Sequence, residues 1–329
     1  MKSVIVKQKE DGNILATTDN PAPEMGPEDL LVKVHHAAVN RTDILNKKGK
    51  VNYAVNPILG VEAAGTVVDA NGSRSFSEGD RVMGLVNGGG YAEYAVMPAD
   101  RAMPIPQSLS FAEAAAIPEV FLTAYQTLFW IAELKYQETV LIHAGASGVG
   151  TAAIQLAKQL RDAQVIVTAG SEEKLQFCRE LGADVLINYK EQSFADAVQE
   201  ATNAQGVDVI LDFVGARYWD KNLASIKEGG RWVLIGVLGG SELSSADLMP
   251  LMSKYVQLTG TLLTPRSDAY KAELSKEFTR VVTNELERGS IRPVIDRIFP
   301  IDEANEAHEY METNSNIGKI ILEVISGEA

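Results

Sequence analysis

Cysteine is nearly absent from this sequence. A single one, Cys178, occurs among 329 residues, so the chain cannot form an internal disulfide. A zinc site made of several thiolates is excluded for the same reason, because structural zinc is held by four Cys or His ligands. Disulfides mark oxidising compartments, and the sequence therefore gives no support for one.

Long hydrophobic runs and an excess of basic charge are also missing. No segment approaches the ~20 apolar residues of a membrane-spanning helix. The opening residues MKSVIVKQKEDG alternate like an edge strand and lack the apolar core of a signal peptide. Lys and Arg number 30 against 44 Asp and Glu, which disfavours nucleic-acid binding. We expect a cytoplasmic protein whose partners are neither nucleic acid nor membrane.

The composition that remains is typical of a globular protein long enough for two domains. The first hundred residues contain short alternating runs, such as 30–34 and 65–69, separated by clusters of Gly, Pro, Asn and Asp. This pattern predicts an antiparallel, barrel-like β domain. Residues 111–134 then have helical spacing, and Pro118 within them predicts a break.

Strand-like and helical patterns alternate between residues 139 and 237. The strand-like runs, such as TVLIHA and VDVILDFV, are apolar along most of their length and therefore predict burial on both faces. The fold class predicted is α/β, a doubly wound parallel sheet of the Rossmann type. The Rossmann domain is placed at 121–264.

The C-terminal residues return to a β pattern. A helix is predicted over Asp268–Gly289, and the chain ends in the strand-like NIGKIILEV, whose simplest pairing partner is the N-terminal β domain. The second domain is therefore predicted to be discontinuous, 1–120 with 265–329. The cofactor site is expected in the cleft between the two domains.

The segment GASGVG, residues 145–150, joins a predicted strand to a predicted helix. It is a variant of the dinucleotide fingerprint in which Ser147 replaces the middle glycine. Small residues let backbone N–H groups approach a pyrophosphate, and Gly150 permits close packing of helix on strand. A tight turn without a ligand is the alternative, but the surrounding alternation favours a cofactor. The predicted contacts are Ala146, Ser147, Gly148 and Val149.

The end of the second strand, VTAGS, bears on the choice of cofactor. NAD enzymes place an acid there to bind the ribose 2′-hydroxyl, whereas this chain has Gly170 and Ser171, followed by Lys174. Small residues and a cation suit a 2′-phosphate, so we predict NADPH rather than NADH. Glu172 and Glu173 complicate the prediction, but acids in a first helical turn complement the helix dipole.

Several segments together resemble the medium-chain dehydrogenase/reductase superfamily, and more narrowly its quinone oxidoreductase, zeta-crystallin-like branch. They are AAVNRTDIL, PILGVEAAG, EGDRVMGL, GGGYAEYAV, HAGASGVGTAAIQLAK and NIGKIILEV. The resemblance covers essentially the whole chain. It implies a GroES-like β-barrel domain beside the Rossmann domain, and a homodimer.

The chain departs from the zinc-dependent members of that superfamily. Those members have a ligand Cys where this chain has Asn40 and a ligand His where it has Val61, and they carry a four-cysteine lobe. Glu62 remains, with a structural role expected. We therefore expect no metal, and Lewis-acid alcohol oxidation is disfavoured.

The resemblance also implies site residues. Lys174 and Tyr189 match contacts to the 2′-phosphate, and Thr123 and Asn40 match the nicotinamide pocket. Further cofactor contacts are implied at Phe213, Gly236, Leu262, Leu263, Thr264 and Asn316. The segment LLTPR departs from the family's more basic LLRSR-like pattern, which leaves the charge contacts there open.

The expected reaction is reduction of a quinone by NADPH, through hydride or electron transfer. The alternatives are an enone or enal reductase and an NADPH-binding structural or regulatory protein. Negative charge then develops on the acceptor oxygen, which a hydroxyl or amide donor would stabilise. Tyr53 and Asn40 are the catalytic candidates, and Ser147 is assigned to the phosphates. Among the histidines, His143 is expected to be structural and His308 to lie on the surface.

Overall fold

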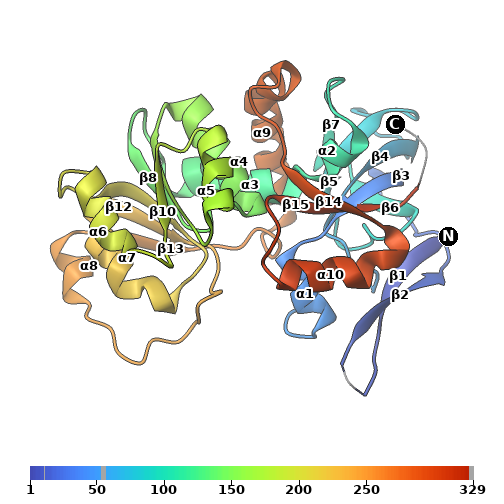
Figure 1. Ribbon diagram of the computed structural model, residues 1–329. Helices are drawn as coiled ribbons and strands as arrows, with labels where there is room; N and C mark the ends of the chain where they lie inside the picture. Colours follow the sequence, from blue (N-terminus) through green and yellow to red (C-terminus); the bar gives the residue numbers. More distant parts are fainter. Residues whose placement is uncertain (11, 53–56, 326–329) are drawn as a thin grey trace. The chain divides into compact units, whose positions relative to one another are not determined.

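The computed structural model describes residues 1–10, 12–52 and 57–325, and the chain divides into two compact units (Figure 1). One unit consists of Met1–Leu122 with Leu263–Ala329, and the other of Thr123–Leu262. The α/β class and the separate GroES-like domain expected from the sequence are confirmed. Within the described ranges no helix is long and apolar enough to cross a membrane.

The first unit is built on a seven-stranded sheet in the order β14-β15-β3-β4-β5-β7, with β6 paired to β3. A separate antiparallel pair, β1 and β2, completes its β-structure. Its strands are β1 (Lys2–Lys7), β2 (Ile14–Asp19), β3 (Asp29–Ala38), β4 (Glu62–Asp69), β5 (Arg81–Leu85), β6 (Tyr94–Pro98), β7 (Ala102–Pro104), β14 (Ile295–Pro300) and β15 (Lys319–Glu323). Its helices are α1 (Arg41–Lys47), α2 (Phe111–Ala115), α9 (Asp268–Arg288), η3 (Ile301–Glu303) and α10 (Ala304–Glu312).

Strand β3 organises this unit because it pairs with three other strands. Leu30, Val32 and Val34 alternate along it with more exposed residues, so one side of the strand faces the core. The C-terminal strand β15 lies antiparallel to the end of β3, with Ile321 opposite Ala38. The prediction that the last strand pairs with the N-terminal β-structure is confirmed.

The second unit has a fully parallel sheet in the order β10-β9-β8-β11-β12-β13, the doubly wound order of dinucleotide-binding domains. The strands are β8 (Thr139–Ile142), β9 (Gln164–Ala169), β10 (Val185–Asn188), β11 (Val207–Asp212), β12 (Ile226–Leu234) and β13 (Gln257–Gly260). The helices are η1 (Gln126–Ile131), α4 (Gly148–Arg161), α5 (Glu172–Glu180), α6 (Phe194–Ala201), η2 (Ala216–Tyr218), α7 (Trp219–Ser225) and α8 (Met249–Ser253). All six residues of β11 are buried, as its apolar run predicts.

The predicted break at Pro118 is confirmed. Helix α2 ends at Ala115, and α3 (Pro118–Tyr125) begins with the proline itself. A proline is tolerated at the start of a helix, where its missing N–H would have no partner within the helix.

Candidate active and cofactor site

The glycine turn connects β8 to α4 in the form that a phosphate site needs. The Ser147 side chain caps the helix, because its Oγ accepts a hydrogen bond from the Gly150 backbone N–H at 3.1 Å. A Cβ at Gly150 would lie 2.4 Å from the carbonyl oxygen of Ala144, so only glycine allows this packing. The first N–H groups of α4 have no acceptor within the helix and are suited to an anion. The turn therefore fits a bound pyrophosphate.

The predicted 2′-phosphate residues come together at the carboxyl ends of β9 and β10. Ser171 caps α5, because its side chain accepts a hydrogen bond from the Lys174 backbone N–H at 3.4 Å. A Cβ on Gly170 would lie 2.7 Å from the Tyr189 hydroxyl, so a larger residue at 170 would push the Tyr189 side chain aside. Tyr189 is 44% exposed, so part of its side chain is accessible to a ligand.

A buried polar network is formed by His143, Thr168 and Asn222. His143 hydrogen-bonds Thr168 Oγ1 through Nδ1 at 2.9 Å and Asn222 Oδ1 through Nε2 at 2.8 Å. Burial lowers the pKa of His143. The structural role expected for His143 is confirmed.

Asp212, at the end of β11, anchors the same network. One carboxylate oxygen accepts from Asn222 and from the Trp232 indole, and the other accepts from the backbone N–H groups of Val214 and Gly215. Asp212 thereby fixes the turn that carries Phe213. Phe213 is 9% exposed, and its carbonyl oxygen would lie 3.1 Å from a Cβ at Gly236, so these two predicted contacts are neighbours.

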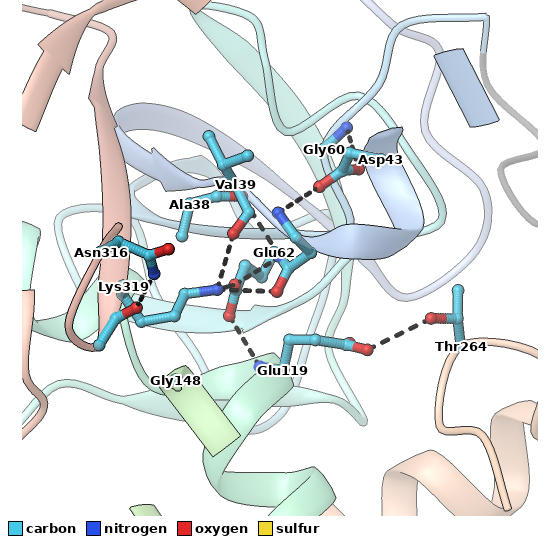
Figure 2. Close-up of polar contacts among 12 residues, drawn as sticks. Ala38, Val39, Asp43, Gly60, Glu62, Glu119, Gly148, Thr264, Asn316 and Lys319 are labelled. Carbon is cyan, nitrogen blue, oxygen red and sulfur yellow. Dashed lines mark hydrogen bonds and ion pairs between the residues drawn. The ribbon is translucent and has the colours of Figure 1, made fainter. Parts of the chain in front are cut away.

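In the first unit, Asn40, Glu62 and Lys319 form a buried cluster. Figure 2 shows Glu62 and Lys319 side by side. The Lys319 ammonium donates to Glu62 Oε1 at 2.8 Å and to Asn40 Oδ1 at 2.7 Å. The Asn40 amide nitrogen donates in turn to Glu62 Oε1 at 2.7 Å and to the Ala38 carbonyl at 3.3 Å. Both amide hydrogens of Asn40 are thus engaged, and its side chain is better suited to positioning Glu62 than to donating to a substrate.

Glu119, in the first turn of α3, joins this cluster from the side of Thr264 (Figure 2). Its backbone N–H donates to Glu62 Oε2 at 2.7 Å, and its Oε1 accepts from Thr264 Oγ1 at 3.3 Å. Burial, and next to it the charge of Glu62, raises the pKa of Glu119 to about 8. This carboxyl group therefore holds a proton at neutral pH.

A second buried acid, Asp43, lies at the start of α1. It accepts hydrogen bonds from the backbone N–H groups of Asn40 and Gly60 and from the Tyr91 hydroxyl. Burial raises its pKa to about 7. Tyr91 also contacts His308 Nε2 at 3.1 Å.

The expectation that His308 lies on the surface is wrong. Its side chain is fully buried, with 0% exposure, because it faces inward from α10 toward Tyr91. Burial lowers the pKa of His308 to about 3, so the ring is neutral at physiological pH.

The remaining predicted residues are placed as follows. Thr123 (7% exposed) lies in α3, and Leu263 (3%) is buried whereas Leu262 (49%) is exposed. Asn316 donates to the Gly318 carbonyl at 2.8 Å. Ala146 is buried, and Ser147, Gly148 and Val149 are partly exposed. Tyr53 lies outside the residues that the structure describes.

Sequence reasoning missed Glu119, Lys319 and Asp212 as members of the site. A signal was present for each, since each is a charged residue within or at the end of an apolar run: AIPEVFL, IGKII and VILD. Charged side chains are rarely buried unless they are paired. Among the described residues, no group of three His, Cys, Asp or Glu side chains is arranged to hold a metal ion.

The sheet order, the glycine turn and the separate GroES-like unit define a nicotinamide-dependent oxidoreductase. Residues 148–279 match the family model of zinc-binding dehydrogenases, and residues 26–107 match the alcohol dehydrogenase GroES-like domain. The quinone oxidoreductase of Rattus norvegicus is 31% identical over 92% of this chain and 90% of the rat protein.

Solved structures agree with this assignment. An NAD-dependent alcohol dehydrogenase matches with a TM-score of 0.87 at 30% identity, covering 99% of this chain and 100% of its own. A mycobacterial protein complexed with NADPH matches with a TM-score of 0.86 at 29% identity, covering 98% and 100%. The chain belongs to the medium-chain dehydrogenase/reductase superfamily, in its quinone oxidoreductase, zeta-crystallin-like branch.

Proposed function

We propose that this protein is an NADPH-dependent quinone oxidoreductase that works without zinc. The observation that carries the proposal is the similarity of 92% of the chain to a quinone oxidoreductase. When bound, the nicotinamide supplies a hydride to the acceptor, and the protein positions the two reactants.

In this proposal three sets of residues bind the cofactor. The start of α4, residues 146–149, binds the pyrophosphate through backbone N–H groups. Gly170, Ser171, Lys174 and Tyr189 bind the 2′-phosphate. The other contacts proposed for the cofactor are Asn40, Thr123, Phe213, Gly236, Leu262, Leu263, Thr264 and Asn316.

The position of Lys319 supports the zinc-independent part of the proposal. Its ammonium lies 2.7–2.8 Å from the side-chain oxygens of Asn40 and Glu62. A divalent cation at these oxygens would have to displace a buried positive charge. Quinones and α,β-unsaturated carbonyls are already electrophilic, so their reduction does not require a Lewis acid.

The test is an NADPH-oxidation assay on chelator-treated protein, with 1,2-naphthoquinone in one arm and an alkenal in the other. We expect turnover of the quinone and no loss of activity on chelation. Preferential turnover of the alkenal would instead identify a double-bond reductase, and NADPH binding without turnover in either arm would indicate a structural or regulatory protein. Activity lost on chelation and restored by zinc would contradict the metal-free mechanism.

We also propose that the protein acts as a homodimer in the cytoplasm. Strand β13 supports the dimer. All of its residues are exposed, and the unpaired edge of a sheet can pair with a second chain.

A further inference from the structure

The acids around Lys319 outnumber the cations. Glu62, Asp43 and Glu119 lie around the buried ammonium of Lys319, and the charges of Glu62 and Asp43 both act on Glu119. Full ionisation of all three would leave a net charge of about −2 in a desolvated region, which is costly. At least one of these groups must therefore carry a proton near neutral pH.

The hydrogen bonds separate the roles of Glu62 and Glu119. The two oxygens of Glu62 accept from Lys319, from the Asn40 amide and from the Glu119 backbone N–H. An ionised carboxylate suits such acceptor-only surroundings. In the described part of the chain, the Glu119 carboxyl group has one hydrogen bond, from Thr264. Of these two acids, Glu119 is therefore the one with room for a proton.

Accessibility distinguishes Glu119 from the other acids as well. Glu62 and Asp43 have 0% exposure, whereas Glu119 is partly exposed. A partly exposed acid can pass a proton to a bound molecule and recover one from water. Glu119 also lies four residues before Thr123 in α3, which places both on one face of the helix.

We propose that Glu119 is the general acid that protonates the oxygen of the reduced acceptor. The inference rests on the proposed function, since it assigns the proton donor of that same site. Two of its neighbours support the assignment: Thr264, which contacts it directly, and Asn40, which shares Glu62 with it, are both proposed cofactor contacts.

Transfer of a hydride and then of a proton converts the quinone into the hydroquinone. A hydride passes from NADPH to the quinone, which oxidises the cofactor to NADP⁺ and leaves a hydroquinone anion. The Glu119 O–H bond then breaks, and a new O–H bond forms on the acceptor oxygen to give the hydroquinone. The Glu119 carboxylate, now next to Glu62, takes up a proton from water before the next turnover.

The test compares Glu119→Gln with the wild type and with Glu200→Gln, which makes the same change at an exposed position of α6. General acids contribute on the order of 100-fold or more to turnover, so we expect kcat with 1,2-naphthoquinone to fall about 100-fold in E119Q. The Kd for NADPH and the thermal midpoint should stay close to those of the wild type. Wild-type kcat should decline above about pH 8, where Glu119 loses its proton, and E119Q should lack this decline.

Two further variants make the test specific. The Thr264 hydrogen bond lowers the pKa of Glu119, so Thr264→Val should move the decline in kcat to higher pH. Tyr53→Phe tests the competing donor. Infrared difference spectra of wild type against E119Q should show a protonated carboxyl at pH 7 that disappears at high pH.

Each result has one consequence. The donor role alone is overturned if the wild type is active and E119Q keeps both its kcat and its pH profile. It is also overturned if the fall in kcat and the changed pH profile appear in Tyr53→Phe instead of E119Q. Absence of the protonated-carboxyl signal at pH 7 overturns it without any appeal to turnover. A wild type inactive toward every quinone and alkenal overturns the proposed function and the donor role together.

Discussion

At the scale of single residues, the proposed preference for NADPH over NADH depends above all on Lys174. It lies in the first turn of α5, one turn beyond Gly170, and it is preceded by two exposed acids, Glu172 and Glu173. Those acids would repel a 2′-phosphate if no cation were near. The Lys174 ammonium and the Tyr189 hydroxyl are therefore both needed for the proposed preference.

Replacement of Lys174 by Ala should weaken NADPH binding and leave NADH binding nearly unchanged. A hydrogen bond to a charged group contributes about 1.5–3 kcal/mol, so the Kd for NADPH should rise at least about tenfold. Fluorescence titration with both cofactors measures the two constants. Lys135→Ala removes an exposed lysine of the same unit and should change neither. Equal weakening of both cofactors by K174A would show that Lys174 does not read the 2′-phosphate.

At the scale of single elements, the start of α1 contains an acid, Asp43, whose protonation affects the stability of the folded protein. Asp43 occupies the third position of the helix and accepts from the N-cap backbone of Asn40, which forms a capping box. Its pKa is raised to about 7, so the folded state favours the protonated acid. The stability that this proton contributes is present at low pH and is lost as the pH rises through about 7.

The variant Asp43→Asn should therefore remove one component of the pH dependence of stability. Between pH 6 and pH 8, the wild type should lose about 1 kcal/mol relative to D43N, from a shift of this size. Denaturant unfolding at both pH values gives the two free energies. The two proteins are compared by the slope of their unfolding free energy against pH. The buried, neutral His308 changes this slope in the opposite direction, but it does so in both proteins. Parallel slopes would mean that Asp43 is ionised throughout this range.

Elements were predictable from the sequence where burial leaves a local pattern. The strands β8, β9 and β11 are mainly apolar and buried, and the glycine turn is a contiguous motif. Strand β13 was missed because QLTG is short, exposed and half polar. The polar residues next to His308 in the sequence favour a surface position, which is wrong. The buried residues of α10 recur at helical spacing and include His308: Ala304, Ala307, His308 and Met311.

The polar half of the site was not predictable in the same way. Lys319 and Glu62 are separated by 257 residues, and Tyr91 and His308 by 217. No periodicity or motif connects such pairs, because their contact depends on how β15 docks against β3 and β3 against β4. The sequence shows only that each is a polar residue in apolar surroundings.

At the scale of the whole molecule, the edge of the parallel sheet is the surface most suited to self-association. Strand β13 pairs only with β12 among the described strands, and its outer edge is open. Apolar side chains are exposed on β13 and in the preceding residues: Leu258 (38%), Leu248 (57%), Met249 (62%), Met252 (68%) and Tyr255 (70%). Exposed apolar side chains that gather along an unpaired edge mark an interaction surface.

The double variant Leu258→Lys with Met252→Glu should convert the proposed dimer into a monomer. Charges on an edge strand oppose pairing with a second edge, and burial of these two side chains would then be lost. Sedimentation velocity of the wild type and the variant measures the masses, which should differ by a factor of about two for a dimer and a monomer. Ile298→Lys is the matched control, since Ile298 is 46% exposed on β14, the edge strand of the other sheet. A monomeric wild type would refute the dimer, and dissociation by I298K but not by the double variant would move the interface to the first unit.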